Sequence, residues 1–244
     1  MDDKKIAVVI PARYGSTRFP GKPLFKIAGK PMIQWTYEKA VAAEGIYKVI
    51  VATDDHRIFD CVEAFGGDVV MTSSQHPSGT DRIAEAIQGL DCDLVINVQG
   101  DEPTIPADVI SRLSQEMIKT GAEMGTVAVP ISRDGDDFLN PNVVKVVKGV
   151  DNYALYFSRA SIPFLREGGD AVLPLKHWGI YAYTPKLIND FISWPESPLE
   201  RCEKLEQLRA LDRGVKILVI TSDHDTVGVD TPEDVQKVEQ ILKK

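Results

Sequence analysis

The sequence predicts an α/β fold in which a mostly parallel or mixed sheet is sandwiched between helices. Short apolar runs rich in β-branched residues alternate with segments of helical spacing through the first half of the chain. Residues 93–98 form a continuous apolar run, which is typical of parallel strands buried on both faces. With 244 residues and 43% hydrophobic content the chain can bury a large core, so we expect a single domain spanning residues 1–244.

The first half of the chain has the clearest pattern. The apolar run 6–10 stops abruptly at Pro11 and predicts the first strand. The other predicted elements of this half are strand 47–52, helix 58–65 closed by Gly66-Gly67, strand 68–72, a helix capped by Thr80 or Asp81 and running to Gln88, strand 93–98, helix 107–120 and strand 125–130. This order indicates parallel strands with helices on both faces of the sheet.

The second half has a different pattern. Residues 143–147 and 153–158 predict two paired strands around a turn. The elements that follow are a glycine-containing loop at 166–174, strand 177–183, a short helix from Pro185, an amphipathic helix 199–211, strand 216–220 and a final helix starting at Thr231-Pro232. We therefore expect this half to contribute a mixed-sheet insertion that forms one wall of the site.

Composition excludes several classes of protein. The formal net charge of −8 argues against a general nucleic-acid or anionic-membrane surface. No apolar run approaches the roughly 20 residues that span a bilayer, and the short run after Lys5 does not resemble a secretory signal. Cys61, Cys92 and Cys202 are odd in number and widely spaced, as expected for reduced thiols. We expect a cytoplasmic enzyme without a nucleic-acid or membrane partner.

A cationic loop follows the first strand. Residues 11–23 contain Arg13, Arg18 and Lys22 together with Gly15 and Gly21. Small residues let a polyphosphate approach backbone amides, and the cations can neutralise its charge. Because open α/β sheets bind ligands at the carboxyl ends of their strands, the loop predicts a nucleoside triphosphate site.

The spacing of residues in this loop argues against two other phosphate-binding motifs. A P-loop needs four residues between its glycines and a hydroxyl after its lysine, but five residues separate Gly15 from Gly21 and Pro23 follows Lys22. No Gly-x-Gly-x-x-Gly follows a strand, which argues against a dinucleotide fold. A surface turn with solvated cations is the remaining alternative.

Two carboxylates lie where they can face this loop. Asp101 follows strand 93–98, and Asp230 precedes the final helix. Mg²⁺ takes oxygen ligands and usually combines one or two protein carboxylates with substrate phosphates, so both are candidate metal ligands. The alternatives are a strand-end turn for Asp101 and helix capping for the region of Asp230. Thr53-Asp54, at another strand end, can contact a base or ribose edge, or cap the next helix.

A second polar cluster lies on apolar elements of the second half. An arginine, an imidazole, a phenol, a carboxylate and an amide suit a small polyhydroxylated acid, and arginine matches the two oxygens of a carboxylate. His177 and Tyr181 lie four residues apart, so both point to one face of a strand. Taken singly, each of these side chains also has an ordinary structural role. The candidates are Arg159, His177, Tyr181, Glu206 and Gln207.

These motifs together resemble one family. The segments that carry the resemblance are 11–24, 52–54, 78–82, 97–103, 153–163, 177–183, 205–209 and 229–234. The chain resembles the CMP-Kdo synthetases, the 3-deoxy-manno-octulosonate cytidylyltransferases of lipopolysaccharide biosynthesis, nearly end to end. The loop 11–24 alone is similar to the wider group of sugar nucleotidyltransferases.

The resemblance implies a nucleotide-diphospho-sugar transferase (Rossmann-like) fold and a cytoplasmic, Mg²⁺-dependent homodimer that joins CTP to Kdo, giving CMP-Kdo and pyrophosphate. Residues 1–130 would form the nucleotide-binding half, and 131–230 the sugar-binding and dimerisation half. By the same resemblance Arg13, Ser16 and Lys22 grip the triphosphate, Asp101 and Asp230 hold the metal, and Arg13, Lys22 and both aspartates are catalytic. The implied cytidine contacts are Thr53, Asp54, Ser78, Gly79, Thr80 and Arg82. The implied sugar contacts are Gln99, Arg159, His177, Tyr181, Glu206 and Gln207.

The sequence departs from the family pattern at Trp178, where relatives usually carry Leu or Ile, and at Phe19, where many carry Leu. Neither change loses a polar group. The alternatives kept open are the same chemistry on the 8-amino analogue of Kdo or on another acidic sugar such as a sialic acid, a nucleotide-binding regulatory protein, and a retaining glycosyltransferase. Glycosyltransferases commonly hold metal through an Asp-x-Asp motif, whereas this strand ends in Gln99-Gly100-Asp101.

Overall fold

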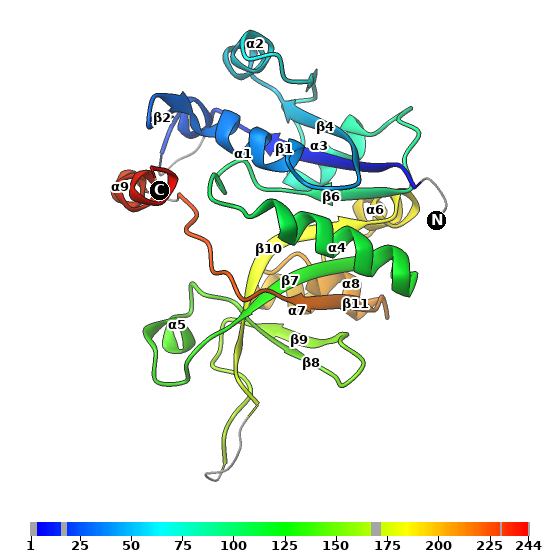
Figure 1. Cartoon of the computed structure of the whole chain (residues 1–244). Helices are drawn as coiled ribbons and strands as arrows, with labels where there is room; N and C mark the ends of the chain where they lie inside the picture. Colours follow the sequence, from blue (N-terminus) through cyan, green and yellow to red (C-terminus); the bar gives the residue numbers. More distant parts are fainter. Residues whose placement is uncertain (1–3, 16–18, 167–171, 230, 244) are drawn as a thin grey trace.

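A central mixed sheet organises the molecule. The computed structural model describes residues 4–15, 19–166, 172–229 and 231–243. The strands of the main sheet are β1 (Ile6–Ala12), β4 (Ile46–Thr53), β5 (Val69–Met71), β6 (Leu94–Asn97), β7 (Met124–Pro130), β8 (Lys145–Lys148), β9 (Ala154–Ser158), β10 (Leu175–Tyr183) and β11 (Ile217–Thr221). Over the described residues their order is β11-β7-β10-β6-β1-β4-β5, and the β8–β9 pair extends from β10 (Figure 1).

Parallel pairing places the ends of the first strands at one edge of the sheet. β1 pairs in parallel with β4 on one side and with β6 on the other. β7 and β11 form a second parallel pair. β10 runs antiparallel between them, with Tyr181 opposite Asn97 of β6. The mixed sheet predicted from the sequence is therefore confirmed, with antiparallel pairing of β10 to β6, β7 and β8 and of β8 to β9.

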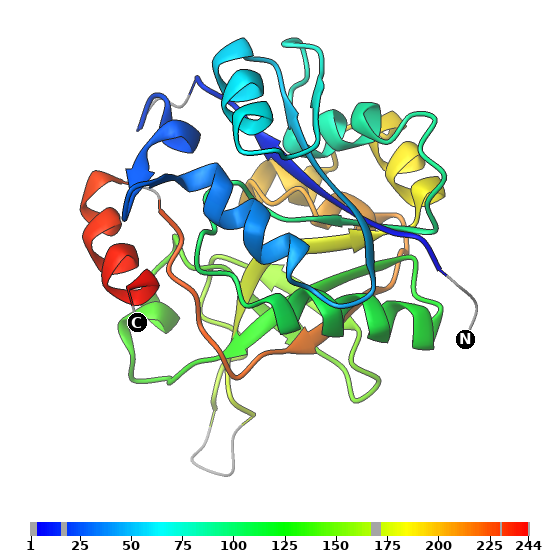
Figure 2. The same cartoon turned by 45° about the horizontal axis from the view of Figure 1, so that its top comes forward.

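Helices cover both faces of the sheet. They are α1 (Met32–Val41), α2 (His56–Ala64), α3 (Gly79–Ala86), α4 (Ala107–Thr120), α5 (Asp136–Leu139), α6 (Pro185–Ser193), α7 (Pro198–Glu203), α8 (Leu208–Asp212) and α9 (Pro232–Leu242), with a 3-10 turn η1 (Lys22–Leu24). α1 and α4 pack against one face and α3, α6 and α8 against the other (Figures 1 and 2). Neighbouring residues of β1 enter opposite cores, because successive side chains of a strand alternate.

Most predicted elements of the first half are confirmed within a few residues at each end. The predicted cap of α3 is wrong: Ser78, in extended conformation, accepts hydrogen bonds from the backbone N–H of Thr80 and Asp81, at 3.1 and 3.2 Å. Two elements were not predicted: helix α1, and the small hairpin of β2 (Lys26–Ile27) and β3 (Lys30–Pro31). These elements close the stretch between the cationic loop and β4.

The single helix predicted at 199–211 is also wrong. The chain leaves α7 at Lys204, which adopts the left-handed conformation with φ 53°, and begins again at α8. Arg159 of the adjacent β9 end donates from Nε to the Glu203 carbonyl at 2.7 Å, which satisfies an oxygen that a longer helix would bond internally. Glu206 and Gln207 therefore lie in the connection between two short helices instead of in mid-helix.

A C-terminal strap leads from β11 to α9. We use this name for residues 222–229, which run past the end of β6 (Figure 2). Thr226 Oγ1 donates to Glu102 Oε2 at 3.1 Å, and the Val229 N–H donates to the Asp101 carbonyl at 3.0 Å. α9 then packs beside the β2 hairpin in a small core of Phe19, Ile27, Met32, Val229, Val235 and Val238. The far end of the chain is thus held against the cationic loop.

Two further sequence expectations concern compartment and membrane. Cys61, Cys92 and Cys202 are free thiols. Within the described ranges, every helix is too short or too polar to cross a bilayer.

Candidate functional site

The cationic loop is closed upon itself. The Gly21 N–H donates to the Tyr14 carbonyl at 2.9 Å, and Gly21 has φ +70°, a conformation that favours glycine. A Cβ at this position would meet the Tyr14 ring at 3.1 Å. The Arg57 guanidinium lies over the Tyr14 ring, 3.3 Å from the ring centroid. These contacts fix where Arg13 and Lys22 enter the site; Ser16 lies outside the described residues.

Lys22 joins three distant parts of the chain. Its Nζ lies 2.5 Å from Asp101 Oδ2, beyond the end of β6, and donates to the Val229 carbonyl of the strap at 2.8 Å. The Lys22 side chain is 14% exposed and that of Asp101 35%. The loop, the β6 end and the strap therefore meet at one ammonium group, as parallel β1 and β6 require.

A cavity of about 200 Å³ opens beside this ion pair. Its walls come from the end of β1, the cationic loop and the turn after β6. The lining residues are Pro11, Ala12, Arg13, Gly15, Lys22, Pro23, Gln99, Gly100 and Asp101. Gly100 is required by close approach, because a Cβ there would lie 3.2 Å from the Pro11 carbonyl oxygen. The predicted residues Arg13, Lys22, Gln99 and Asp101 are thus brought together.

The donor set of this cavity suits a hard cation shared with phosphates. Asp101 supplies a partly exposed carboxylate. Among the described residues no cluster of three or more His, Cys, Asp or Glu side chains exists, so a site made of protein ligands alone is absent there. Mg²⁺ needs only one or two carboxylates when phosphates supply further oxygens. Asp230, the second predicted ligand, lies outside the described residues; its predecessor Val229 bonds to Asp101.

The predicted cytidine residues surround the ends of β4 and α3. Arg82 is fully buried and donates from Nη2 to Asp54 Oδ2 at 2.9 Å and from Nη1 to Thr72 Oγ1. Thr53 is buried at the end of β4, and its hydroxyl accepts the N–H of Asp55 at 3.2 Å. Arg82 therefore orients Asp54 at the strand end. Of the remaining residues, Ser78 caps α3, Gly79 begins that helix, and Thr80 donates to Glu206.

The second polar cluster forms on the face of β10 that α8 covers. The rings of His177 and Tyr181 lie 5.3 Å apart, which confirms that both point to one face. The Thr80 hydroxyl donates to Glu206 Oε2 at 2.8 Å. Among the residues that the structure describes, the buried Tyr181 hydroxyl and Gln207 Nε2 have no hydrogen-bond partner. Buried polar groups rarely stay unpartnered, so these two atoms are available to a ligand.

Burial controls the protonation of this cluster. It lowers the pKa of His177 to about 3, so the imidazole is neutral at ordinary pH. It raises the pKa of the Tyr181 hydroxyl well above its usual value. Burial also raises the pKa of Glu206, opposed by the hydrogen bond from Thr80. The cluster thus offers a phenol, an amide, an imidazole and a carboxylate to a polyhydroxylated ligand.

Two predicted sugar residues bond to the protein itself. Arg159 donates from Nε to the Glu203 carbonyl at 2.7 Å and from Nη1 to the Pro141 carbonyl at 3.0 Å. Gln99 lines the cavity beside Lys22 and Asp101 and donates from Nε2 to Asn97 Oδ1 at 3.0 Å. Sequence reasoning missed Thr126, whose hydroxyl lies 3.1 Å from His177 Nε2. The available sequence signal was a single threonine within the otherwise apolar predicted strand 125–130.

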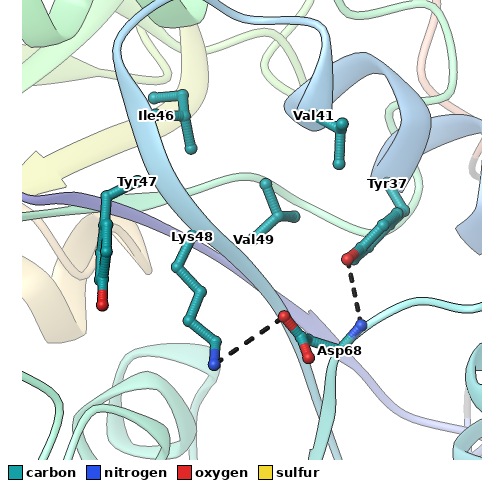
Figure 3. A pocket seen from close by; sticks show the side chains of 7 residues that line it. All are labelled: Tyr37, Val41, Ile46, Tyr47, Lys48, Val49 and Asp68. Carbon is teal, nitrogen blue, oxygen red and sulfur yellow. Dashed lines mark hydrogen bonds and ion pairs between the residues drawn. The ribbon is translucent and has the colours of Figure 1, made fainter.

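A larger hollow, of about 390 Å³, lies at the opposite end of the strands. It is formed by the start of β4 and by α1, and Lys48 Nζ lies 3.8 Å from Asp68 Oδ2 inside it (Figure 3). The Asp68 N–H donates to the Tyr37 hydroxyl at 3.0 Å. None of the predicted site residues lines it. The cavity at the carboxyl ends of β1 and β6 is therefore the candidate active site.

Comparisons with known proteins show the family of the chain. A family model described as cytidylyltransferase matches residues 7–217. A 3-deoxy-manno-octulosonate cytidylyltransferase from Aliivibrio fischeri is 53% identical over 247 residues, covering 97% of this chain and 98% of the relative. The protein of the same name from Thermodesulfovibrio yellowstonii is 50% identical, covering 96% of each chain.

Solved structures show the same similarity. A structure of CMP:2-keto-3-deoxy-manno-octonic acid synthetase complexed with CTP has a TM-score of 0.93 and 44% identity, covering 98% of both chains. A 4-diphosphocytidyl-2C-methyl-D-erythritol synthase from Anaerococcus prevotii has a TM-score of 0.65 at 18% identity, which shows a shared fold alone.

Proposed function

The chain belongs to the 3-deoxy-manno-octulosonate cytidylyltransferase family, and we propose that it joins CTP to 3-deoxy-manno-octulosonate (Kdo), giving CMP-Kdo and pyrophosphate for lipopolysaccharide biosynthesis. The observation that carries the proposal is the meeting of Arg13, Lys22 and Asp101 at one cavity, beside a second cluster that suits a sugar acid.

The chemistry follows from charge. The anomeric hydroxyl of the sugar acid attacks the α-phosphorus of CTP in line; the new O–P bond forms as the bond to the pyrophosphate oxygen breaks, and the hydroxyl proton is lost to solvent. No enzyme nucleophile is required, so the protein contributes position and electrostatic stabilisation. Lys22 and Arg13 offset negative charge on the triphosphate, and Ser16 is proposed as a further contact.

We propose Mg²⁺ as the cofactor, with Asp101 and Asp230 as its protein ligands. The support is the partly exposed Asp101 carboxylate and the hydrogen bond that Val229, next to Asp230, makes to the Asp101 carbonyl. When bound, the ion would supply Lewis acidity at the α-phosphate and lower the pKa of the attacking hydroxyl. Asp101 and Lys22 already hold opposite charges at hydrogen-bond distance, so the carboxylate is oriented before substrates enter.

We propose that the remaining site residues form two subsites, one for the cytidine of CTP and one for the sugar acid. Arg82 holds Asp54 at the end of β4, where Thr53, Asp54 and the start of α3 would contact cytidine. Tyr181, Gln207, Glu206 and His177 would bind the sugar hydroxyls. The assigned roles of Gln99 and Arg159 stay predictions; Arg159 would have to exchange a bond to a chain carbonyl for one to the sugar carboxylate.

Pyrophosphate release tests the proposal. The protein would be mixed with CTP, Mg²⁺ and, in turn, Kdo, its 8-amino analogue and a sialic acid. We expect release with Kdo and a higher kcat/KM for Kdo than for the other two. A preference for the 8-amino analogue would keep the chemistry and change the substrate. Absence of release with every sugar acid would refute the transferase and favour a regulatory nucleotide-binding protein.

A homodimer in the cytoplasm is proposed as the working form. The β8–β9 hairpin and the segment before β10 expose several large apolar side chains, which is unusual on a monomer. They are Val150, Leu155, Phe164, Leu165, Val172 and Leu173. Light scattering should give twice the chain mass, and Val150→Glu combined with Phe164→Glu should give a monomer. Exposed Tyr47→Glu, on the opposite side of the sheet, is the matched control. A monomeric wild type would refute the dimer.

The free cysteines fit a reducing compartment such as the cytoplasm, and cell fractionation can check this location.

A further inference from the structure

Thr126 and His177 are connected at an irregular point in the sheet. β7 and β10 pair regularly up to Val127 opposite Trp178, after which Gly179 and Ile180 bulge and Tyr181 lies opposite Thr126. The bulge carries an even number of residues, so His177, Tyr181 and Thr126 share one face of the sheet. This is the face that carries the second polar cluster.

The Thr126 hydroxyl has three polar neighbours and one proton. It lies 2.7 Å from the Ile180 carbonyl oxygen, 3.3 Å from the Trp178 carbonyl oxygen and 3.1 Å from His177 Nε2. The carbonyl oxygens can only accept, and the shortest of the three distances assigns the single hydroxyl proton to the Ile180 carbonyl. The oxygen of Thr126 is then left as an acceptor facing His177.

The tautomer of His177 follows from this arrangement. Because Thr126 has no second proton to give, Nε2 must carry the hydrogen and donate to the threonine oxygen. The imidazole is neutral, since burial lowers its pKa to about 3. Nδ1 is therefore a bare acceptor, and it has no hydrogen-bond partner among the described residues. His177 as a whole residue is only partly buried.

We propose that Thr126 is a positioning residue of the sugar site: it fixes His177 as the Nε2–H tautomer, so that Nδ1 accepts a hydrogen bond from a hydroxyl of the sugar acid. Phe157 and Tyr181 hold the ring plane, with centroids 5.1 and 5.3 Å from that of His177. The Tyr181 hydroxyl, which has no hydrogen-bond partner in the described part of the chain, lies in the same cluster and supplies a donor to complement the Nδ1 acceptor. The assignment of the ligand rests on the proposed function; the assignment of the tautomer does not.

The tautomer is measured first, in the free wild-type protein. Long-range proton–nitrogen NMR of ¹⁵N-labelled protein distinguishes a protonated ring nitrogen from a bare one, and His177→Phe identifies the signal among the four histidines. We expect a single Nε2–H species. An Nδ1–H species, or a mixture of the two, would overturn the proposal. This measurement needs no substrate, so it stands even if no sugar acid is turned over.

The functional arm compares three substitutions. Thr126→Val removes the hydroxyl at nearly constant volume and should give a mixture of His177 tautomers. The KM for Kdo should rise by about 3- to 10-fold, which is the effect of losing one neutral hydrogen bond. The KM for CTP should change by less than about twofold. Thr126→Ser should restore both the tautomer and the KM. Thr221→Val, where the hydroxyl bonds to no described residue, is the control for the exchange itself.

A cycle with His177 separates positioning from general damage to the sheet. In a His177→Phe background, Thr126→Val should not raise the KM for Kdo further, because the interaction it disturbs is already gone. An additional increase in that background, or an unchanged KM in the single variant with a shifted tautomer, would refute the functional role. Should Thr126→Val fail to fold, the wild-type spectrum and the Thr126→Ser variant still decide.

Discussion

Replacing Asp101 by asparagine removes one negative charge and leaves shape and volume almost unchanged. The wild-type carboxylate lies 2.5 Å from Lys22 Nζ, and an asparagine oxygen can still accept that hydrogen bond. The backbone carbonyl of residue 101, which accepts the Val229 N–H, is untouched. The substitution therefore tests the charge at this position while the strap stays anchored.

The expected magnitudes differ sharply for stability and for activity. The two side chains of the ion pair are 14% and 35% exposed, so weakening it should cost about 1 kcal/mol or less of unfolding free energy. A central electrostatic group lost from the reacting centre reduces turnover by at least about a hundredfold, or roughly 2.7 kcal/mol of transition-state stabilisation. Without Mg²⁺, CTP should bind no more weakly, and up to about fivefold more tightly, because a repelling charge is gone.

Three measurements decide the outcome: pyrophosphate release at saturating Mg²⁺, urea unfolding, and CTP titration in the absence of metal. Asp91→Asn is the matched control, since Asp91 precedes β6, pairs with Lys5 and has an 86% exposed side chain. It should change neither turnover nor CTP affinity. Near-normal turnover of Asp101→Asn at saturating Mg²⁺ would remove this carboxylate from the mechanism, and a large loss of stability would mean that its role is structural.

Three other predictions concern the histidine, the buried ion pair and the glycine of the site. The pKa of His177 is about 3 in the folded protein and near 6.5 in the unfolded chain. The unfolded chain therefore binds the extra proton, and the free energy of unfolding falls as pH drops from about 6.5 toward 3. His177→Phe should lower the slope of unfolding free energy against pH by roughly 1.4 kcal/mol per pH unit in this range, and equal slopes would contradict the burial argument. Arg209 donates to Glu200 from Nε at 2.8 Å and from Nη2 at 2.6 Å, with side chains 14% and 8% exposed; Glu200→Ala should cost about 3–5 kcal/mol in urea unfolding, because it removes the bidentate partner of a largely buried guanidinium and the side-chain half of the α7 capping box, and a cost below about 1 kcal/mol would show that water replaces the partner. Gly100→Ala places a Cβ 3.2 Å from the Pro11 carbonyl oxygen and should raise the KM for CTP. Expressed as a free energy, this rise should exceed the loss of unfolding free energy. An unchanged KM would mean that the turn yields without disturbing the cavity.

The local pattern of apolar and polar residues in the sequence was enough to predict much of the fold. The β-branched run of β1 and the continuous apolar run of β6 identify strands buried on both faces, since such runs have no solvated alternative. The helix predicted at 107–120 is α4. The strand-end position of Asp101 and the cations after β1 predicted a shared cavity, because parallel strands bring their carboxyl ends to one edge. These features depend on residues close together in sequence.

Long-range partners decided the rest. The helix predicted at 199–211 breaks at Lys204, where Arg159, some 45 positions earlier, bonds to the carbonyls that would have continued it. No local propensity reports such a partner. Arg82 stays a predicted cytidine contact; tertiary packing buries it fully and directs it to Asp54, a partner that no local pattern reports.

Sequence by itself thus determined the chemistry available to this protein: which strand ends carry cations and carboxylates, and which family its motifs match. Only the tertiary structure decided how those groups are used. It inserted β10 antiparallel between β6 and β7, and the bulge opposite Thr126 then set which atoms of His177 face the protein and which remain for a ligand. The physical reason is that hydrogen-bond direction depends on neighbours distant in sequence, whereas residue type and strand pattern do not.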